Sequence, residues 1–296
     1  MKNTFKIFSL LLLAATSAKA AMTGAQFLKI DTDARLSGMA SAGVASAIGI
    51  NALSYNPAGL TAITSPEVAF SHSKWLMDAN HDFVGFGMPL KGFGLGVGIT
   101  RLSNSSIDGR GEDRSAAGGF SAYDQAVSVG FGFKNVGGAV KYIQSSIAGE
   151  HAEAFAIDLG ARRAIKGFPA TVGLGVQNLG TGIKYMSQRD NLPLSVSAGV
   201  MVAAFPGVSL GLDVKRLVYD KQTIFSAGSE YALVMGNNMG FALRGGYGLT
   251  GITQANSKNG LSFGAGIMAL GAQLDYSMST ETGLGSVQRI TLRKKF

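Results

Sequence analysis

The sequence contains no cysteine at all. Disulfide frameworks, thiolate metal sites and lipid attachment to a cysteine behind a signal peptide are therefore excluded. Its three histidines, His72, His81 and His151, are dispersed and lack the close spacing of zinc ligands. We expect no metal site and no cofactor.

Long apolar runs are also missing. After residue 20 no stretch approaches the roughly 18 consecutive apolar residues of a membrane-spanning helix, although 46% of the chain is hydrophobic and only 15% is charged. This excludes a helical membrane protein. The 42 glycines would weaken the helices of a soluble domain, since each interior glycine costs about 1 kcal/mol relative to alanine, and they suit strands and tight turns. The formal charge of +8 comes from scattered basic residues, which argues against a nucleic-acid partner.

The first twenty residues predict a secretory signal peptide. Lys2 and Lys6 precede the mostly apolar run Ile7 to Ala15, and Ala18-Lys19-Ala20 supplies small residues at the expected cleavage positions. The apolar run is too short to anchor the chain as a helix across a bilayer. We expect residues 1–20 to be removed and the mature chain to begin at Ala21.

From Val68 onward, apolar residues alternate with small or polar ones, which is the period of a β-strand. In the clearest segment, Phe93, Leu95, Val97 and Ile99 share one face while the residues between them are glycines. Fourteen such segments are expected. They are Glu67 to Lys74, Asp82 to Pro89, Gly92 to Leu102, Ala122 to Phe133, Val136 to Ser145, Glu153 to Arg163, Ala170 to Asn178, Leu192 to Ala203, Val208 to Tyr219, Thr223 to Leu233, Gly240 to Leu249, Leu261 to Ala269, Ala272 to Ser279 and Val287 to Phe296.

Alternation alone does not separate a soluble sandwich from a membrane barrel, whose apolar face meets lipid. The number of segments is even, and short connections such as Leu90-Lys91 alternate with long ones: Ser103 to Ser121, Leu179 to Asn191 and Thr250 to Gly260. Short periplasmic turns and long external loops are typical of outer-membrane barrels. We therefore predict an all-β fold, a transmembrane antiparallel β-barrel of about 14 strands over residues 66–296, surrounded by the lipids of the bacterial outer membrane.

The chain ends on an amphipathic segment whose last residue is Phe296. A terminal aromatic residue on the last strand resembles the signal that the outer-membrane assembly machinery reads, so we expect this machinery as a partner.

Residues 21–65 follow a different pattern. Strand alternation disappears there, and Leu36 to Ala47 consists mostly of glycine, alanine and serine. A barrel of about fourteen strands has an interior too wide for its own wall side chains to fill, above all where those are glycines. We predict that this N-terminal segment forms a hatch or plug in the lumen.

Two stretches of the segment resemble the sequences of a known family of barrels. Asp33-Ala34-Arg35-Leu36-Ser37-Gly38-Met39-Ala40-Ser41-Ala42-Gly43-Val44, followed by Asn51-Ala52-Leu53-Ser54-Tyr55-Asn56-Pro57-Ala58-Gly59-Leu60, resembles the start of FadL-superfamily barrels, particularly the shorter PorV/PorQ-like branch. The resemblance implies a fourteen-stranded barrel with an N-terminal hatch. In the long-chain fatty acid branch such barrels serve passive uptake of hydrophobic molecules, and in the PorV branch they serve a secretion or surface-attachment system.

The candidate site residues fall into two groups. Asn56, Pro57, Ala58 and Gly59 form the candidate gate of the hatch, although turn chemistry alone also accounts for an Asn-Pro corner. Charged residues at inward strand positions are lumen-lining candidates, either as a hydrated path or as ordinary ion pairs inside a wet barrel. These are Lys141, Asp158, Arg162, Asp213, Lys215, Glu230, Arg244 and Asp275.

Three functions remain open from the sequence. The leading hypothesis is a non-enzymatic outer-membrane channel that passes or binds hydrophobic small molecules such as long-chain fatty acids. The alternative is a PorV-like adaptor barrel serving protein secretion or surface attachment. The remote alternative is an outer-membrane hydrolase, because Gly207-Val208-Ser209-Leu210-Gly211 matches a nucleophile-elbow pattern, although no helix is expected after it.

Overall fold

The computed structural model describes residues 23–110, 116–185, 188–235, 239–250, 258–281 and 285–296. The expected signal peptide, residues 1–20, lies outside this range. None of the helices in the described ranges is both long and apolar enough to span a membrane.

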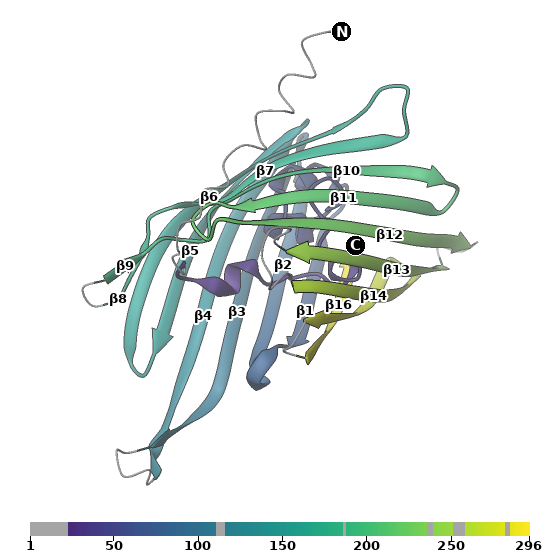
Figure 1. Cartoon of the computed structure of the whole chain (residues 1–296). Coiled ribbons are helices and arrows are strands. Elements are labelled where there is room, and N and C mark those ends of the chain that lie inside the picture. The colour runs from purple at the N-terminus through teal and green to yellow at the C-terminus, as the bar shows by residue number, and fades with distance from the viewer. Residues whose placement is uncertain (1–22, 111–115, 186–187, 236–238, 251–257, 282–284) are drawn as a thin grey trace.

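Fourteen antiparallel strands close into a barrel, which confirms the predicted fold class (Figure 1). In chain order the barrel strands are β1 (Glu67–Lys74), β2 (Asn80–Leu90), β3 (Phe93–Arg110), β4 (Ala116–Phe133), β5 (Val136–Ile147), β6 (Glu150–Ala164), β7 (Ala170–Gly180), β10 (Ser195–Phe205), β11 (Val208–Leu217), β12 (Gln222–Met235), β13 (Met239–Thr250), β14 (Lys258–Ala269), β15 (Ala272–Glu281) and β16 (Gly285–Lys295). Strand β16 pairs with β1 to close the ring, with Leu292 opposite Phe70.

The outer face of the barrel is apolar. On β3, Phe93, Val97 and Ile99 point outward and are 39%, 46% and 43% exposed, whereas the glycines between them are buried. The same alternation places Phe131 and Leu159 outward on β4 and β6. Because such a belt is stable only against lipid, the chain is a membrane-spanning barrel.

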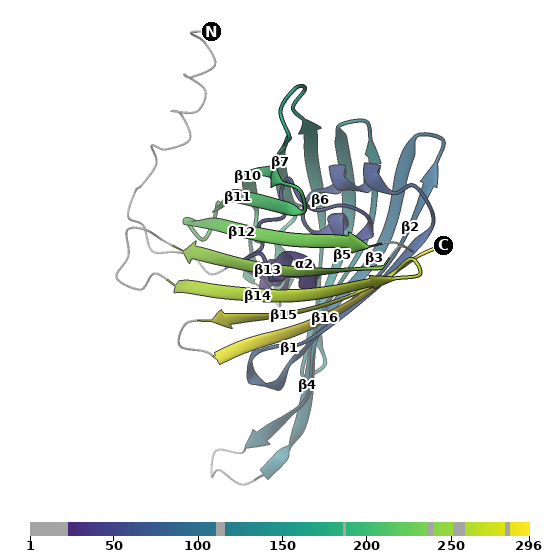
Figure 2. The ribbon, with the colours of Figure 1, turned by 90° about the vertical axis from the view of Figure 1, so that its right-hand side faces the viewer.

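The expected loops differ most from the structure in three places. Residues 103–121 were expected as an external loop, but most of them extend β3 and β4, and this hairpin projects beyond the neighbouring strands in both views (Figures 1 and 2). The connection after β7 contains a separate two-stranded sheet, β8 (Ile183–Tyr185) with β9 (Gln188–Asp190). Strand β10 begins at Ser195 and not at Leu192, because Pro193 has no N–H for a ladder bond.

The N-terminal segment, here residues 23–66, lies inside the ring of strands (Figure 2). It forms the 3-10 helix η2 (Gln26–Lys29), the short α2 (Ala34–Ser37) and the 3-10 helices η3 (Ile50–Ser54) and η4 (Pro57–Ala62), and a further 3-10 turn, η5 (Leu76–Asp78), joins β1 to β2. Inward glycines let its backbone touch the wall. A Cβ built at Gly137 on β5, for example, would collide with Pro57 and Ala58, and one at Gly246 on β13 would collide with Met39 and Ala40.

Candidate functional site

The barrel mouth on the side of the long connections is crossed by η2. Lys29 forms a 2.7 Å ion pair with Asp220, which lies in the turn between β11 and β12. The amide of Gly24 donates to the carbonyl of Asn191 just before β10. These contacts tie η2 to the wall next to β10 to β12, and its side chains face two halves of the mouth: Phe27 faces β4 to β6, whereas Leu28 and Lys29 face the side of β10 to β15.

The half facing β4 to β6 is packed and apolar. Phe27 of η2 is 1% exposed and packs in one cluster with small inward residues of the wall. The other buried members of this cluster are Ala126, Ile143, Ala152, Ala154, Ala156, Ile183 and Leu192. We call this cluster the dry half of the mouth.

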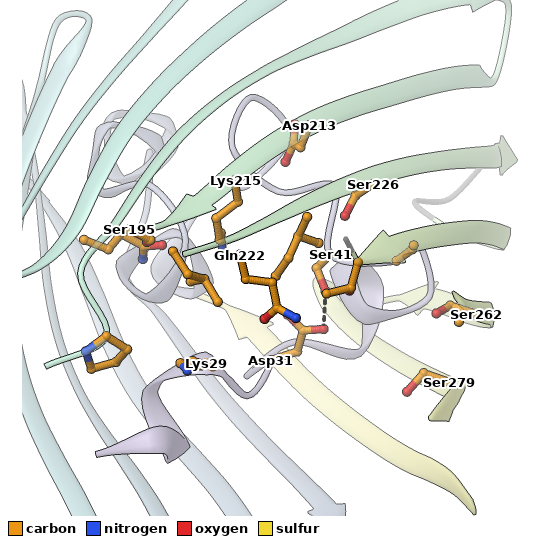
Figure 3. Close-up of a pocket in the computed structure, with 18 of the residues that line it drawn as sticks. Lys29, Asp31, Ser41, Ser195, Asp213, Lys215, Gln222, Ser226, Ser262 and Ser279 are labelled. Atoms are coloured by element: carbon orange, nitrogen blue, oxygen red, sulfur yellow. Dashed lines mark hydrogen bonds between the residues drawn. The ribbon is translucent and has the colours of Figure 1, made fainter. Parts of the chain in front are cut away.

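The half facing β10 to β15 contains a cavity of about 310 Å³ between the N-terminal segment and the wall (Figure 3). Hydroxyl and amide side chains dominate its lining. These are Ser41, Ser195, Ser226, Ser262, Ser279, Thr250, Thr280, Gln177, Asn178 and Gln222, joined by the charged Lys29, Asp31, Asp213 and Lys215. We call this cavity the wet half of the mouth.

Asp31 fixes the segment at the edge of the wet half. Its carboxylate accepts from the Ser41 hydroxyl at 2.6 Å (Figure 3) and from the Tyr55 phenol at 3.1 Å. Burial, with the nearby carboxylate of Asp31 as the second cause, raises the pKa of Tyr55 well above its usual value. The phenol therefore stays protonated and keeps donating this hydrogen bond.

A buried chain of charges joins the segment to the wall below the cavity. Arg35 donates hydrogen bonds from Nε and Nη2 to the carboxylate oxygens of Glu230 on β12, at 2.8 and 2.7 Å. Arg244 on β13 then bridges Glu230 at 2.6 Å and Asp275 on β15 at 2.7 Å. Since each charge has an opposite partner, three of the predicted lumen residues act here as paired groups.

The other predicted lumen residues also lie on the inner face. Asp213 accepts from the backbone N–H of Val44 at 2.7 Å, and Arg162 donates to the carbonyl of Ala45 at 2.8 Å, so both hold the segment. Lys141 and Asp158 instead pair with each other at 2.6 Å within the wall. Lys215 lines the wet half.

The four residues of the candidate gate form a fixed corner. Asn56 is fully buried and caps η4 by accepting from the N–H of Ala58 at 3.1 Å, and Pro57 is the first residue of the helix. The side-chain amide nitrogen of Asn56 lies 2.7 Å from the carbonyl oxygen of Val44. It lies 3.1 and 3.3 Å from the carbonyl oxygens of Ala161 on β6 and Leu174 on β7. Gly59 packs against Ala47, where a Cβ would collide with the backbone carbonyl.

Sequence reasoning missed several anchors of the segment. Buried Glu67, the first residue of β1, accepts from the N–H of Ile50 at 2.5 Å. Arg289, 2% exposed on β16, donates to the hydroxyls of Ser37 at 2.9 Å and Ser73 at 3.3 Å. Both are charged residues at inward strand positions, so the alternation that selected the other eight residues also contained the signal for these two.

The hydrolase pattern does not have the geometry of a nucleophile elbow. Strand β11 runs through Ser209, which pairs with Glu230 of β12, and no helix follows it. Of the histidines, His72 contacts Asp82 at 2.7 Å on the outer surface, whereas His81 is buried inside. Across the described ranges, no three His, Cys, Asp or Glu side chains are grouped to hold a metal ion.

Comparisons with known proteins support the fold. Neither a protein-family model nor a curated protein matches the sequence. Among solved structures, the chain is similar to the toluene transporter TodX of Pseudomonas putida, with TM-score 0.61 and 13% identity over 89% of this chain and 97% of that one. It is also similar to a FadL homologue of Pseudomonas aeruginosa, with TM-score 0.58 and 11% identity over 95% of this chain and 100% of that one.

A third similar structure is the toluene transporter TbuX of Ralstonia pickettii, with TM-score 0.56 and 14% identity over 90% of this chain and 99% of that one. At these identities the likeness shows that the chain has the fold of these FadL-type barrels.

Proposed function

We propose that this protein is an outer-membrane channel for small molecules and that its N-terminal segment is the gate. The observation that supports this most is the arrangement of the lumen: the segment fills it, yet a cavity of about 310 Å³ lies between the segment and the wall at the mouth. Similarity in fold to the toluene transporters TodX and TbuX supports a transport role.

The proposed location is the bacterial outer membrane. The apolar outer belt requires lipid, and a closed barrel satisfies its backbone hydrogen bonds there. Export would use the signal peptide of residues 1–20. Insertion would use the assembly machinery, which would read β16 and Phe296, the residue directly after it, which is 72% exposed.

The moving part of the gate is proposed to be residues 23–47. On the side of β10 to β15 its contacts with the wall include side-chain hydrogen bonds and ion pairs, such as Lys29 with Asp220 and Arg35 with Glu230, which can exchange for water. Asn56 to Gly59 would stay in place as the hinge, because Asn56 is bonded to β6 and β7 and η4 lies against wall glycines. The four residues of the candidate gate, Asn56 to Gly59, would thus be its fixed end.

A disulfide tether tests this gate. A Cβ built at Gly248 on β13 lies 3.9 Å from the Cβ of Ala40, within the usual 3.5–4.5 Å of a disulfide. Because the chain has no other cysteine, the double variant Ala40→Cys with Gly248→Cys can form only this intramolecular bridge. We expect uptake of radiolabelled toluene, lauric acid or L-arabinose by cells carrying the oxidised variant to fall to the level of cells without the barrel.

The same variant, reduced, is the control, since two thiols fill nearly the volume of the disulfide. Reduction is expected to restore uptake of whichever solute the wild type carries. Equal uptake in both states would show that the segment does not move, and would overturn the gate.

The second candidate is an adaptor barrel of the PorV kind. Two observations favour it: the segment is held by buried anchors on separate strands of the wall, Asn56 on β6 and β7 and Arg35 on β12, and the β3–β4 hairpin projects from the barrel (Figure 1). An adaptor would use the segment as a permanent plug. A protein that co-purifies with the wild type and is lost when residues 106–119 are deleted would support this role.

The finer expectation is a hydrophobic cargo such as a long-chain fatty acid. The description of TodX as a monoaromatic hydrocarbon channel supports that class for a barrel of this fold. An apolar depression of about 450 Å³ exists on this chain as well, around Gly138 between Phe131 and Leu159, but it lies on the lipid-facing surface. The wet half of the mouth, by contrast, is lined mainly by hydroxyl and amide side chains.

A further inference from the structure

The lining of the wet half is polar, whereas a binding site for a hydrocarbon would be apolar. Five serines, two threonines, two glutamines and one asparagine face the cavity, against a small apolar group of Leu28, Ala40, Pro193, Leu217 and Ile224. Burying a hydroxyl or amide against an apolar ligand without a hydrogen bond is unfavourable, because the group loses its bonds to water. Ser41, Gln177, Asn178 and Thr280 are already hydrogen-bonded within the protein, but a hydrocarbon would offer no partner to the other six polar groups.

We propose that the wet half of the mouth is the binding site for a small, uncharged, hydroxyl-rich solute, such as a simple sugar. This names the substrate class of the proposed channel, and rests on the proposed function only for the claim that the bound solute is then carried inward. Hydroxyl groups both donate and accept, and so do the serine, threonine and amide side chains of the lining.

The charges around the cavity support a ligand without net charge. Two cations, Lys29 and Lys215, and two carboxylates, Asp31 and Asp213, line it, and Lys29 is already paired with Asp220. Each carboxylate is already bonded within the protein, Asp31 to Ser41 and Asp213 to the N–H of Val44. A charged solute would find no excess of opposite charge in this cavity. A neutral polar solute does not need such a charge to bind.

The volume supports one small molecule. About 310 Å³ is at the lower end of the range of small-molecule pockets, roughly 300–1,000 Å³. In the view of Figure 3, labelled serines of β10, β12, β14 and β15 lie on the wall around this space, and Asp31, Lys29 and Ser41 lie on the segment across it. A ligand here would touch both the wall and the proposed gate, so its binding could bias the position of the gate.

Saturation-transfer NMR on the purified full-length barrel in nanodiscs tests the binding class. The probes are L-arabinose, toluene and lauric acid. The test variant replaces Ser226, Ser262 and Ser279 with alanine, and the matched control is Ser128→Ala, at a buried serine of β4 outside the cavity. We expect saturable binding of L-arabinose to the wild type and the control, and binding at least about tenfold weaker to the triple variant, since three hydrogen bonds are lost.

Two results would overturn the proposal. One is no saturable L-arabinose binding to the wild type while toluene or lauric acid binds; the other is unchanged L-arabinose binding to the triple variant. The gate fails separately. If L-arabinose binds as expected but the Ala40–Gly248 tether leaves uptake unchanged, the binding class holds and the gate is wrong; if the tether blocks toluene uptake and L-arabinose does not bind, the reverse holds.

Discussion

The two halves of the lumen mouth are lined by inward side chains of almost the same size. On the side of β4 to β6 these are mostly alanines, such as Ala126 and Ala154, and Phe27 packs on them so closely that it is 1% exposed. On the side of β10 to β15 they are mostly serines, such as Ser226 and Ser262, and a cavity remains between wall and segment. At the mouth, the segment thus packs closely on the alanine-lined part of the wall and leaves a cavity beside the serine-lined part.

The halves also differ in how the segment is attached. On the dry side, apolar burial holds η2, while on the wet side the ion pairs of Arg35 and Arg244 act beside the close packing of Met39 and Ala40 on Gly246. Apolar packing is lost in one cooperative step, whereas hydrogen bonds and ion pairs can be exchanged one by one for bonds to water or ligand. This is the physical reason for placing the opening of the proposed gate on the side of β10 to β15.

The largest effect should follow from removing the central charge of the wet side. Arg244→Met leaves Asp275 without its cation and Glu230 with Arg35 alone. Breaking a buried pair by removing one partner costs about 3–5 kcal/mol, and we expect a loss of this order in the free energy of unfolding by urea in lipid vesicles.

The control for that variant is Lys74→Met. Lys74 lies 3.6 Å from Asp78 with both side chains exposed, and such pairs contribute little. A similar loss in both variants would mean that burial of the Arg244 pairs does not stabilise the barrel.

A smaller effect is expected from filling the space where η4 lies against the wall. In Gly137→Ala, the new methyl group would meet the backbone of Pro57 and Ala58, which has no flexible end to yield. Overpacking of this kind costs about 1–3 kcal/mol, so we expect faster amide hydrogen exchange across residues 57–62.

The matched variant is Gly245→Ala, where the nearest atom to a new Cβ is the Ser229 hydroxyl oxygen at 3.9 Å. It should leave exchange in η4 unchanged. Equal exchange in the two variants would show that close backbone approach does not hold the hinge.

Much of the barrel follows from the sequence, because a strand's period of two is a local property. Strand β1 occupies Glu67–Lys74, the predicted bounds, and alternation alone predicts the inner face for Asp213 and Glu230, which are both buried there. The extension of β3 and β4 was missed because the polar run at residues 103–110 has no lipid-facing alternation, and a strand beyond the membrane needs none.

The site was harder to predict than the wall. Alternation gives the face of a residue but not its neighbour across the lumen, so the pairing of Arg35 with Glu230, 195 positions apart, has no local signal. The division into dry and wet halves is visible in the sequence only as alanine at 152, 154 and 156 against serine at 195, 226 and 262. Its meaning depends on where Phe27 lies, which is set by the fold of the whole barrel.

The most direct test of the two halves is chemical labelling from the external side. Because the chain lacks cysteine, Ser226→Cys and Ala154→Cys each provide one thiol, the first in the wet half and the second in the dry half. With a small water-soluble maleimide added to intact cells, we predict that Cys at 226 is modified within minutes while Cys at 154 reacts at least about tenfold more slowly, because Phe27 covers it. Equal rates at the two positions would contradict the division of the mouth and, with it, the placement of the channel opening along β10 to β15.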